Sequence, residues 1–194
     1  MAGLTRGDLY SLEQYAEQRN AFRDRVMAHK KDRRVTLGPN ATLYFEDRLT
    51  IQYQIQEMLR AERTFEGAAI QEELDAYNPL IPDGRNLKAT LMLEYDDEME
   101  RRLALEKLVG IEDHVWVRVG GHDAVYAIAD EDLEREKPDK TSAVHFLRFE
   151  LTSEMVRAAK QGATLAMGID FPAYHYRTEA LPDNIRTSLI KDLA

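Results

Sequence analysis

Strict alternation of apolar and polar residues between Leu87 and Tyr95 limits the folds open to this chain more than any other feature. Leu87, Ala89, Leu91, Leu93 and Tyr95 share one face of an extended segment, and the residues between them share the other. A period of two is typical of a β-strand with one buried face. The chain therefore contains a sheet whose apolar face is covered by other elements.

Similar patterns and turn residues predict the remaining elements along the chain. The expected strands are 34–37, 42–46, 114–119, 124–129, 143–151, 163–170 and 174–178, and the expected helices are 11–31, 47–66, 68–77, 97–109, 153–161 and 182–193. Residues 131–140 are expected to form a charged loop or a short helical turn. Short hairpin connections favour antiparallel pairing.

These elements indicate an α+β fold, with a mainly antiparallel sheet, helices packed on it and a helical N-terminal part. We expect a single domain over residues 1–194, in which the helical part spans roughly 1–82 and the sheet-rich part roughly 85–194. The boundary between them is the segment Pro79–Gly84, because its proline and glycine residues stop regular structure.

Composition excludes several classes of protein. No stretch free of charged residues reaches a dozen positions, and the first residues hold no apolar segment, so we expect neither a membrane span nor a secretory signal. The chain has no cysteine, which excludes disulfides, thiolate metal sites and iron–sulphur ligation. A cytoplasmic location is compatible with this composition.

Charge argues against a nucleic-acid partner. The formal net charge is −9, whereas nucleic-acid binders carry a basic excess. Basic residues gather only between Arg23 and Arg34, where no aromatic residues are interleaved as single-strand binders require. We interpret this strip as the solvated end of the first helix, where cations favour the macrodipole.

Recognised catalytic and cofactor motifs are missing from the sequence. It contains no Gly-x-Gly-x-x-Gly, no phosphate-binding loop, no Gly-x-Ser-x-Gly, no His-Glu-x-x-His and no Glu-x-x-His. Ser188 and Lys191 match Ser-x-x-Lys without any companion motif. We therefore predict no cofactor and no metal, and no catalytic residue is assigned.

The densest polar stretch runs from Gln52 to Arg85 and supplies a candidate polar cluster. Its members are Glu57, Arg60, Glu62, Glu73, Asp75, Asn78 and Arg85. The buried stripe of the predicted helix 47–66 consists of Ile51, Ile55, Met58, Leu59 and Phe65. By its spacing Glu62 falls on this stripe, and Glu73 lies beside the stripe of the next helix.

Two interpretations of this cluster remain open. Carboxylates directed toward a helix–helix contact bind a hard cation through oxygen, or share a proton. Alternatively, the neighbouring arginines neutralise them in an internal ion-pair network, which is the commoner arrangement.

The five histidines form no close pair in the sequence. His145 alternates with Leu147, Phe149 and Leu151, so it shares the apolar face of its strand and is expected to be a hydrogen-bonded core residue. A general-base or ligand role would need a neighbour, for which His175 is the candidate.

Three strings of residues carry a resemblance to a known family: 37–46 (LGPNATLYFE), 54–60 (QIQEMLR) and 73–82 (ELDAYNPLIP). Together they resemble an uncharacterised bacterial family of about this length, and the similarity spans almost the whole chain. Members of that family are often encoded beside rubrerythrin and an iron–sulphur oxidoreductase. The resemblance implies a setting of redox or peroxide stress, and it supplies no catalytic residue.

The sequence therefore favours an accessory or interaction protein of a redox-stress system, without chemistry of its own. Its expected partner is another protein of that system, and a homodimer is compatible with the sequence. The alternative is a small metal-binding protein or enzyme whose site is built from the carboxylates of the candidate polar cluster.

Overall fold

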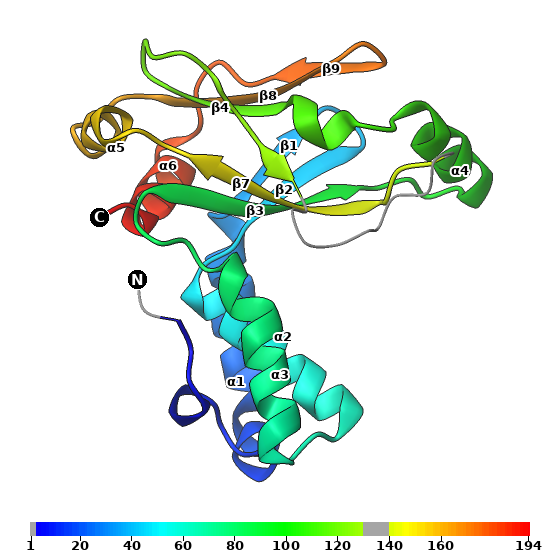
Figure 1. The fold of residues 1–194 in the computed structure, drawn as a ribbon, viewed down its shortest axis with the longest axis vertical. Helices are drawn as coiled ribbons and strands as arrows, with labels where there is room; N and C mark the ends of the chain where they lie inside the picture. Colours follow the sequence, from blue (N-terminus) through cyan, green and yellow to red (C-terminus); the bar gives the residue numbers. More distant parts are fainter. Residues whose placement is uncertain (1–2, 130–139) are drawn as a thin grey trace.

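A computed structural model describes residues 3–129 and 140–194. Three helices form an arm: α1 (Leu12–Lys31), α2 (Arg48–Glu62) and α3 (Gly67–Tyr77), with a two-stranded hairpin between α1 and α2 in the chain. Ser11 and Asp47 cap the first two helices with capping boxes, as the sequence predicts for Ser11. The arm extends away from the sheets and has its own apolar clusters (Figure 1).

Two antiparallel sheets form the rest of the fold. The first has the strand order β1 (Arg34–Leu37), β2 (Ala41–Phe45), β3 (Asn86–Leu93), β7 (Val144–Glu150) and β6 (Ile128–Ala129). The second has the order β5 (Val125–Tyr126), β4 (Val115–Val119), β8 (Leu165–Phe171) and β9 (Tyr174–Arg177). The prediction of an α+β fold with antiparallel sheets and a helical N-terminal part is confirmed.

The main core lies between the facing sides of the two sheets (Figure 1). The alternation that predicts β3 is confirmed, because Leu87, Ala89, Leu91 and Leu93 are all buried. Further helices lie at the ends of the sheets: α4 (Glu98–Lys107), α5 (Ser153–Lys160) and α6 (Asp183–Leu189). Helix α4 projects to one side, whereas α5 and α6 lie together at the other end (Figure 1).

The prediction of one continuous strand over residues 124–129 is wrong, because this segment forms two short strands. Val125 and Tyr126 pair with β4 in the second sheet, whereas Ile128 and Ala129 pair with β7 in the first. Ala127 lies between the two short strands and is buried. The chain therefore crosses from one sheet to the other at this point, which a hairpin pattern cannot reveal. The predicted charged segment that follows lies, apart from its final lysine, outside the described residues.

Tyr174 joins the two sheets along one edge. Its buried hydroxyl accepts hydrogen bonds from the backbone N–H groups of Asn40 and Ala41, each at 2.9 Å. The same hydroxyl donates to the Leu37 carbonyl at 2.7 Å. One hydroxyl of β9 therefore satisfies the polar groups at the end of the β1–β2 hairpin.

Close packing on the outer side of the second sheet depends on a glycine. A Cβ atom added to Gly168 would lie 2.5 Å from the ring of Trp116, the only tryptophan of the chain. Arg118 packs its guanidinium over the same ring, 5.6 Å from the centroid. The indole is 4% exposed although it lies on an outer face, so the missing glycine side chain makes room for it.

Arg33 connects the arm, the first sheet and the C-terminal segment. The side chain is 2% exposed and donates to the carbonyl groups of Phe45 and Glu46, each at 3.0 Å. It also pairs with the buried carboxylate of Asp192. Burial raises the pKa of Asp192 to about 6, although Arg33 acts in the opposite direction.

Candidate functional site

The residues of the candidate polar cluster do not converge on one site. Arg60, Glu62, Asp75 and Arg85 are exposed, and Glu57, Glu73 and Asn78 are half-buried. Among them, Arg60 lies close enough to lower the pKa of Glu57, and Glu62 lies close enough to raise that of Glu73. The structure thus separates the members of the cluster. Glu57 lies in a contact between two helices, Asn78 binds the segment before α1, and Asp75 and Arg85 lie on the surface.

Glu57 belongs to a polar contact between α1 and α2. Its carboxylate accepts two hydrogen bonds from the guanidinium of Arg19, each at 2.8 Å, and one from the hydroxyl of Tyr15 at 2.6 Å. Arg19 and then Tyr15 lower the pKa of Glu57 through these bonds. Tyr15 is completely buried. The ion-pair interpretation therefore describes Glu57 well, with Arg19 as the arginine rather than any member of the cluster.

The expected burial of Glu62 is wrong. Glu62 is exposed in the last turn of α2, where a long charged side chain reaches water. Glu73 is half-buried on α3. Its pKa is raised by burial first and by the nearby charge of Glu62 second. Like charges that come this close weaken the contact between α2 and α3.

Side-chain amides of the arm hold the segment that precedes α1. Asn78 accepts a hydrogen bond from the backbone N–H of Leu4 at 2.7 Å and donates to its carbonyl at 2.9 Å. Gln56 accepts from the N–H of Tyr10 at 2.6 Å in the same manner. Asn78, a member of the candidate polar cluster, therefore has a structural role, because its side chain satisfies the backbone polar groups of Leu4.

The side chains of Asp75 and Arg85 make local contacts. Asp75 accepts a hydrogen bond from Gln71 one turn earlier on α3. Arg85 is mostly exposed and lies 3.8 Å from the carboxylate of Asp83, a distance at which an exposed ion pair contributes little.

The two candidate histidines lie in different sheets. His145 on β7 is 1% exposed, as predicted, with its Nε2 atom 3.0 Å from the hydroxyl of Thr141 and 3.8 Å from the carboxylate of Glu112. His175 on β9 is largely exposed and lies 3.4 Å from Asp170. The structure therefore gives no support to a shared histidine site.

The basic strip Arg23–Arg34 is also divided by the fold. Arg33 is internal, as described above, so it is not part of a basic surface. Arg25, Lys30 and Arg34 lie over aromatic rings at 5.8–5.9 Å from the centroids. These cation–π contacts stabilise the fold. The expected absence of nucleic-acid binding stays a prediction.

A cleft of about 480 Å³ lies at the end of the arm that is distant from the sheets. Its walls come from the segment leading into α1 and from the turn between α2 and α3. The lining residues are Arg6, Leu9, Tyr10, Ser11, Leu12, Glu13, Gln14, Leu59, Thr64, Phe65 and Ile70. We call this the arm cleft. Apolar side chains line its interior, and Arg6 and Glu13 supply charge.

Phe65 stands out in the arm cleft because it is 71% exposed. The sequence pattern places it on a buried stripe, and that prediction is wrong because α2 ends at Glu62. Arg63 then adopts a left-handed conformation with φ of 55°, the only positive φ among the described non-glycine residues. The N–H of Thr64 returns to the carbonyl of Leu59 at 2.9 Å. This turn changes the helical phase and directs Phe65 outward.

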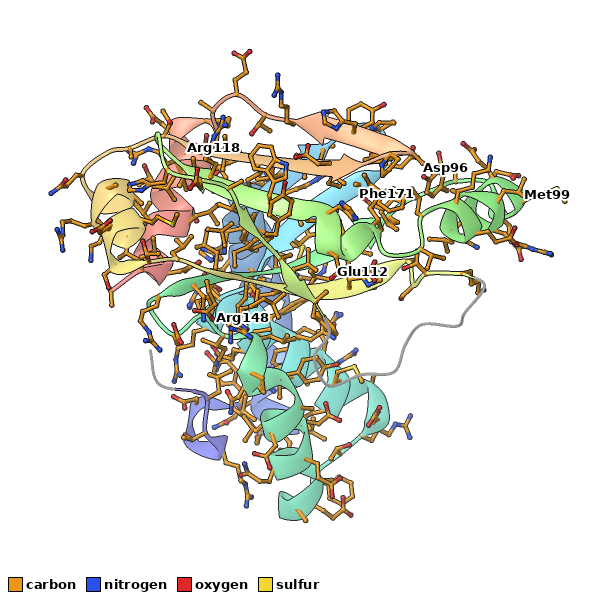
Figure 2. The ribbon with its side chains drawn as sticks, turned by 45° about the horizontal axis from the view of Figure 1, so that its top comes forward. Asp96, Met99, Glu112, Arg118, Arg148 and Phe171 are labelled. Atoms are coloured by element: carbon orange, nitrogen blue, oxygen red, sulfur yellow. The ribbon has the colours of Figure 1, made fainter. Side chains whose placement is uncertain are left out.

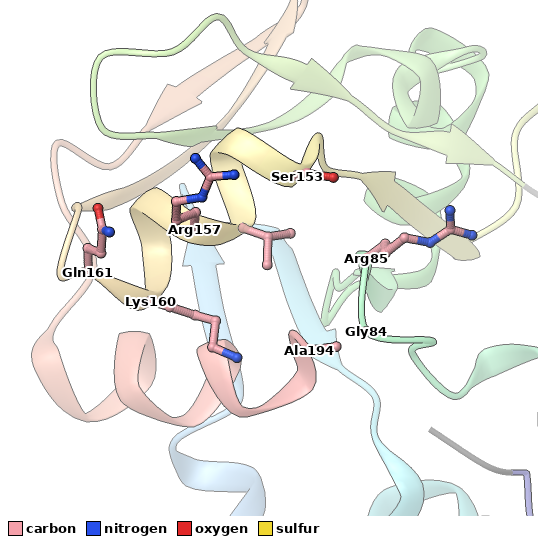
Figure 3. A pocket seen from close by; sticks show the side chains of 8 residues that line it. Gly84, Arg85, Ser153, Arg157, Lys160, Gln161 and Ala194 are labelled. Carbon is pink, nitrogen blue, oxygen red and sulfur yellow. The ribbon is translucent and has the colours of Figure 1, made fainter.

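A second groove, of about 450 Å³, runs along α5 (Figure 3). Its lining includes Arg85, Arg157 and Lys160 but no aspartate or glutamate side chain. Arg85 is the one member of the candidate polar cluster that lines a described groove.

Within residues 3–129 and 140–194, no group of three or more histidine, aspartate or glutamate side chains is arranged to hold a metal ion. None of the helices in these ranges combines the length and apolar character that crossing a bilayer requires.

Comparisons with known proteins place the chain in a family. The family model described as "Protein of unknown function (DUF3501)" matches residues 3–193. A crystal structure of a novel protein of unknown function from Burkholderia pseudomallei K96243 is similar to this fold, with 53% sequence identity, a TM-score of 0.95 and full coverage of both chains. A comparison with curated proteins found no match. The expected resemblance to an uncharacterised family is confirmed, and the chain belongs to this family of proteins of unknown function.

Proposed function

We propose that this chain is an accessory protein that binds another protein of a redox or peroxide-stress system through the arm cleft. The single observation that carries the proposal is a cleft of about 480 Å³ with apolar side chains among its polar ones and a mostly exposed phenylalanine at its edge. The proposal places the protein in the cytoplasm.

The chemistry of the arm cleft favours a protein partner. Leu9, Leu12, Leu59 and Ile70 provide an apolar interior, and Phe65 adds an aromatic side chain that the fold leaves in water. Exposed aromatic residues beside an apolar depression supply much of the binding energy when a partner covers them. An apolar side chain of the partner fills the depression, and the ring of Phe65 packs against the partner's surface.

The backbone turn that displays Phe65 supports the same proposal. A left-handed conformation costs a non-glycine residue about 1–2 kcal/mol, and Arg63 adopts one at this turn. The N–H groups of Arg63 and Thr64 return to the carbonyls of Arg60 and Leu59 at 3.4 and 2.9 Å, the hydrogen bonds of a common helix C-cap. This cap ends α2 and fixes the position of Phe65 outside the helix.

The alternative of a metal or enzyme site built from the candidate carboxylates has no such observation in its favour. Glu57 is occupied by Arg19 and Tyr15, and Asp75 faces water on another helix. A shared site would require these side chains to meet, and the described structure separates them.

A rubrerythrin encoded in the same genome is the first partner to test, because the resemblance in sequence implies this neighbour. Sedimentation velocity of the two purified proteins measures whether they form a complex and with what affinity. We expect Phe65→Ser to weaken the complex about thirtyfold, which corresponds to a hot-spot contribution of about 2 kcal/mol.

Met99→Ser is the matched control for this experiment. Met99 is 72% exposed and points outward from α4, at one end of the sheets and away from the helical arm (Figure 2). The control removes a similar exposed apolar area and should leave the affinity unchanged. Absence of a complex with rubrerythrin, or equal weakening by both substitutions, would contradict the proposal.

A further inference from the structure

The groove along α5 gathers three cations, of which only Arg85 is within 4 Å of a carboxylate in residues 3–129 and 140–194, that of Asp83 at 3.8 Å. Arg157 and Lys160 project from α5, and Arg85 comes from the loop that faces the helix (Figure 3). Within residues 3–129 and 140–194, no carboxylate side chain lies within ion-pair distance of Arg157 or Lys160. Lys160 donates only one long hydrogen bond, at 3.4 Å, to the carbonyl of Leu193.

This concentration of positive charge is unusual for the chain. The protein has a formal net charge of −9, whereas three of the eight residues that line this groove are arginine or lysine. Cations in the last turn of a helix favour its macrodipole, which accounts for Arg157 and Lys160. It does not account for Arg85 on the opposite wall, or for the concave shape between them.

Glycine at position 84 gives the groove its shape. Gly84 has a φ of 103°, and its carbonyl accepts a hydrogen bond from the N–H of Ala194 at 2.8 Å. A Cβ atom at this position would lie 2.8 Å from the Cβ atom of Ala194. The loop and the C-terminal segment can therefore lie side by side as the wall that faces α5. Val156 and Ala194 contribute apolar surface to the same groove.

We infer that this groove binds a small metabolite through a phosphate monoester group. A phosphate monoester carries a charge of about −1.5 to −2 near neutral pH, which the side chains of Arg157 and Lys160 match. Guanidinium groups bind phosphate oxygens in a bidentate manner. The heads of Arg85 and Arg157 are both turned away from that of Lys160 in Figure 3, but both side chains are exposed and can swing over a bound anion.

The size and remaining surface of the groove suit the rest of such a molecule. A volume of about 450 Å³ lies in the range of sites for small ligands. Ser153 and Gln161 lie toward opposite ends of the groove and offer hydrogen bonds to hydroxyl groups. A phosphorylated sugar, with one dianionic end and several hydroxyl groups, has the required chemistry.

Isothermal titration of the full chain with ribose 5-phosphate tests the inference, with ribose and succinate as comparison ligands. We expect saturable 1:1 binding of ribose 5-phosphate at about 0.15 M salt. Ribose lacks the charge and succinate lacks the phosphate geometry, so both should bind at least roughly tenfold more weakly. Equal binding of succinate, or no saturable binding of ribose 5-phosphate, would overturn the inference.

Substitutions assign the binding to this groove. Arg157→Ala with Lys160→Ala should weaken ribose 5-phosphate at least roughly tenfold, because charge-assisted hydrogen bonds are lost. The control is Arg101→Ala with Lys107→Ala, which makes the same change in net charge on exposed positions of α4. Equal weakening by both pairs would show a general charge effect and would also overturn the inference. Circular dichroism of both variants confirms that they are folded.

Discussion

Replacing Glu57 should destabilise the protein far more than replacing Glu62, although the sequence pattern predicts the reverse. The carboxylate of Glu57 accepts hydrogen bonds from Tyr15 and Arg19 at 2.6–2.8 Å. Glu62 is exposed, and its charge raises the pKa of Glu73. Glu57→Ala therefore removes the hydrogen-bond acceptor of Tyr15 and Arg19. Glu62→Ala instead relieves the repulsion between Glu62 and Glu73.

The magnitude follows from what each partner loses. Glu57→Ala leaves the hydroxyl of the fully buried Tyr15 without an acceptor, at a cost of about 1–3 kcal/mol. Arg19 is 28% exposed and can turn to water, so the loss of its ion pair with Glu57 adds about 0–1 kcal/mol. We expect a total of about 1–4 kcal/mol, and a melting temperature lower by about 2–16 °C for a chain of this size. Glu62→Ala should stay within about 0.5 kcal/mol of the wild type.

Urea unfolding followed by circular dichroism and by tryptophan fluorescence measures both variants. The first signal reports the helices, and the second reports the environment of Trp116 in the second sheet. Tyr15→Phe supplies the internal control, because it removes the hydroxyl that Glu57→Ala leaves unsatisfied. The double variant should therefore be more stable than the sum of the single changes predicts. Equal destabilisation by Glu57→Ala and Glu62→Ala, or strict additivity with Tyr15→Phe, would refute the reasoning.

The acid dependence of this contact has a definite sign. Arg19 and Tyr15 hold the pKa of Glu57 below its usual value of 4.5. A lowered pKa means that the contribution of Glu57 to stability is present above the unfolded pKa and is lost as the pH falls through the folded value. The difference between the wild type and Glu57→Ala should therefore shrink in acid.

Three further predictions concern the sheets and the C-terminal segment. Tyr174→Phe should cost about 2–5 kcal/mol in urea unfolding, because it leaves buried backbone groups unsatisfied, whereas Tyr176→Phe on the same strand should have little effect. The carboxyl group of Asp192 should titrate near pH 6 in carbon-detected NMR, and titration at the usual value would contradict this. Because its pKa is raised from 3.8, Asp192 should stabilise the fold in acid, and this contribution should be lost as the pH rises through about 6. Gly168→Ala should lower the free energy of unfolding by about 1–3 kcal/mol through overpacking against the tryptophan, and Gly121→Ala, where a Cβ atom meets nothing within 4 Å, should not.

Much of the secondary structure could be predicted because it depends on local pattern. The alternation at Leu87–Leu93 gives β3 with its buried face, and Ser11 marks the start of α1. Where prediction went wrong, a long-range contact competed with the pattern. The segment 124–129 divides at Ala127 because each half finds a different sheet.

The candidate site was harder to predict, since polar residues look alike in a sequence whatever they bind. Asn78 holds the backbone of Leu4, and Glu57 holds Tyr15 and Arg19, so their partners lie many residues away. The sequence does not indicate the arm cleft, because Phe65 continues a helical spacing past the end of α2. The pair Arg157 and Lys160 carries the spacing of one helix face, but nothing in the sequence indicates that Arg85 faces it.

The sequence by itself determined the α+β class, the antiparallel strands, most element boundaries and the family, because periodicity, turn residues and overall similarity are local or additive properties. Tertiary structure decided which side chains meet. The burial of Arg33, the exposure of Phe65 and the groove between α5 and Gly84 depend on segments far apart in the chain. The physical reason is that burial and charge pairing are set by the neighbours that folding brings within a few ångströms, and these neighbours are not adjacent in sequence.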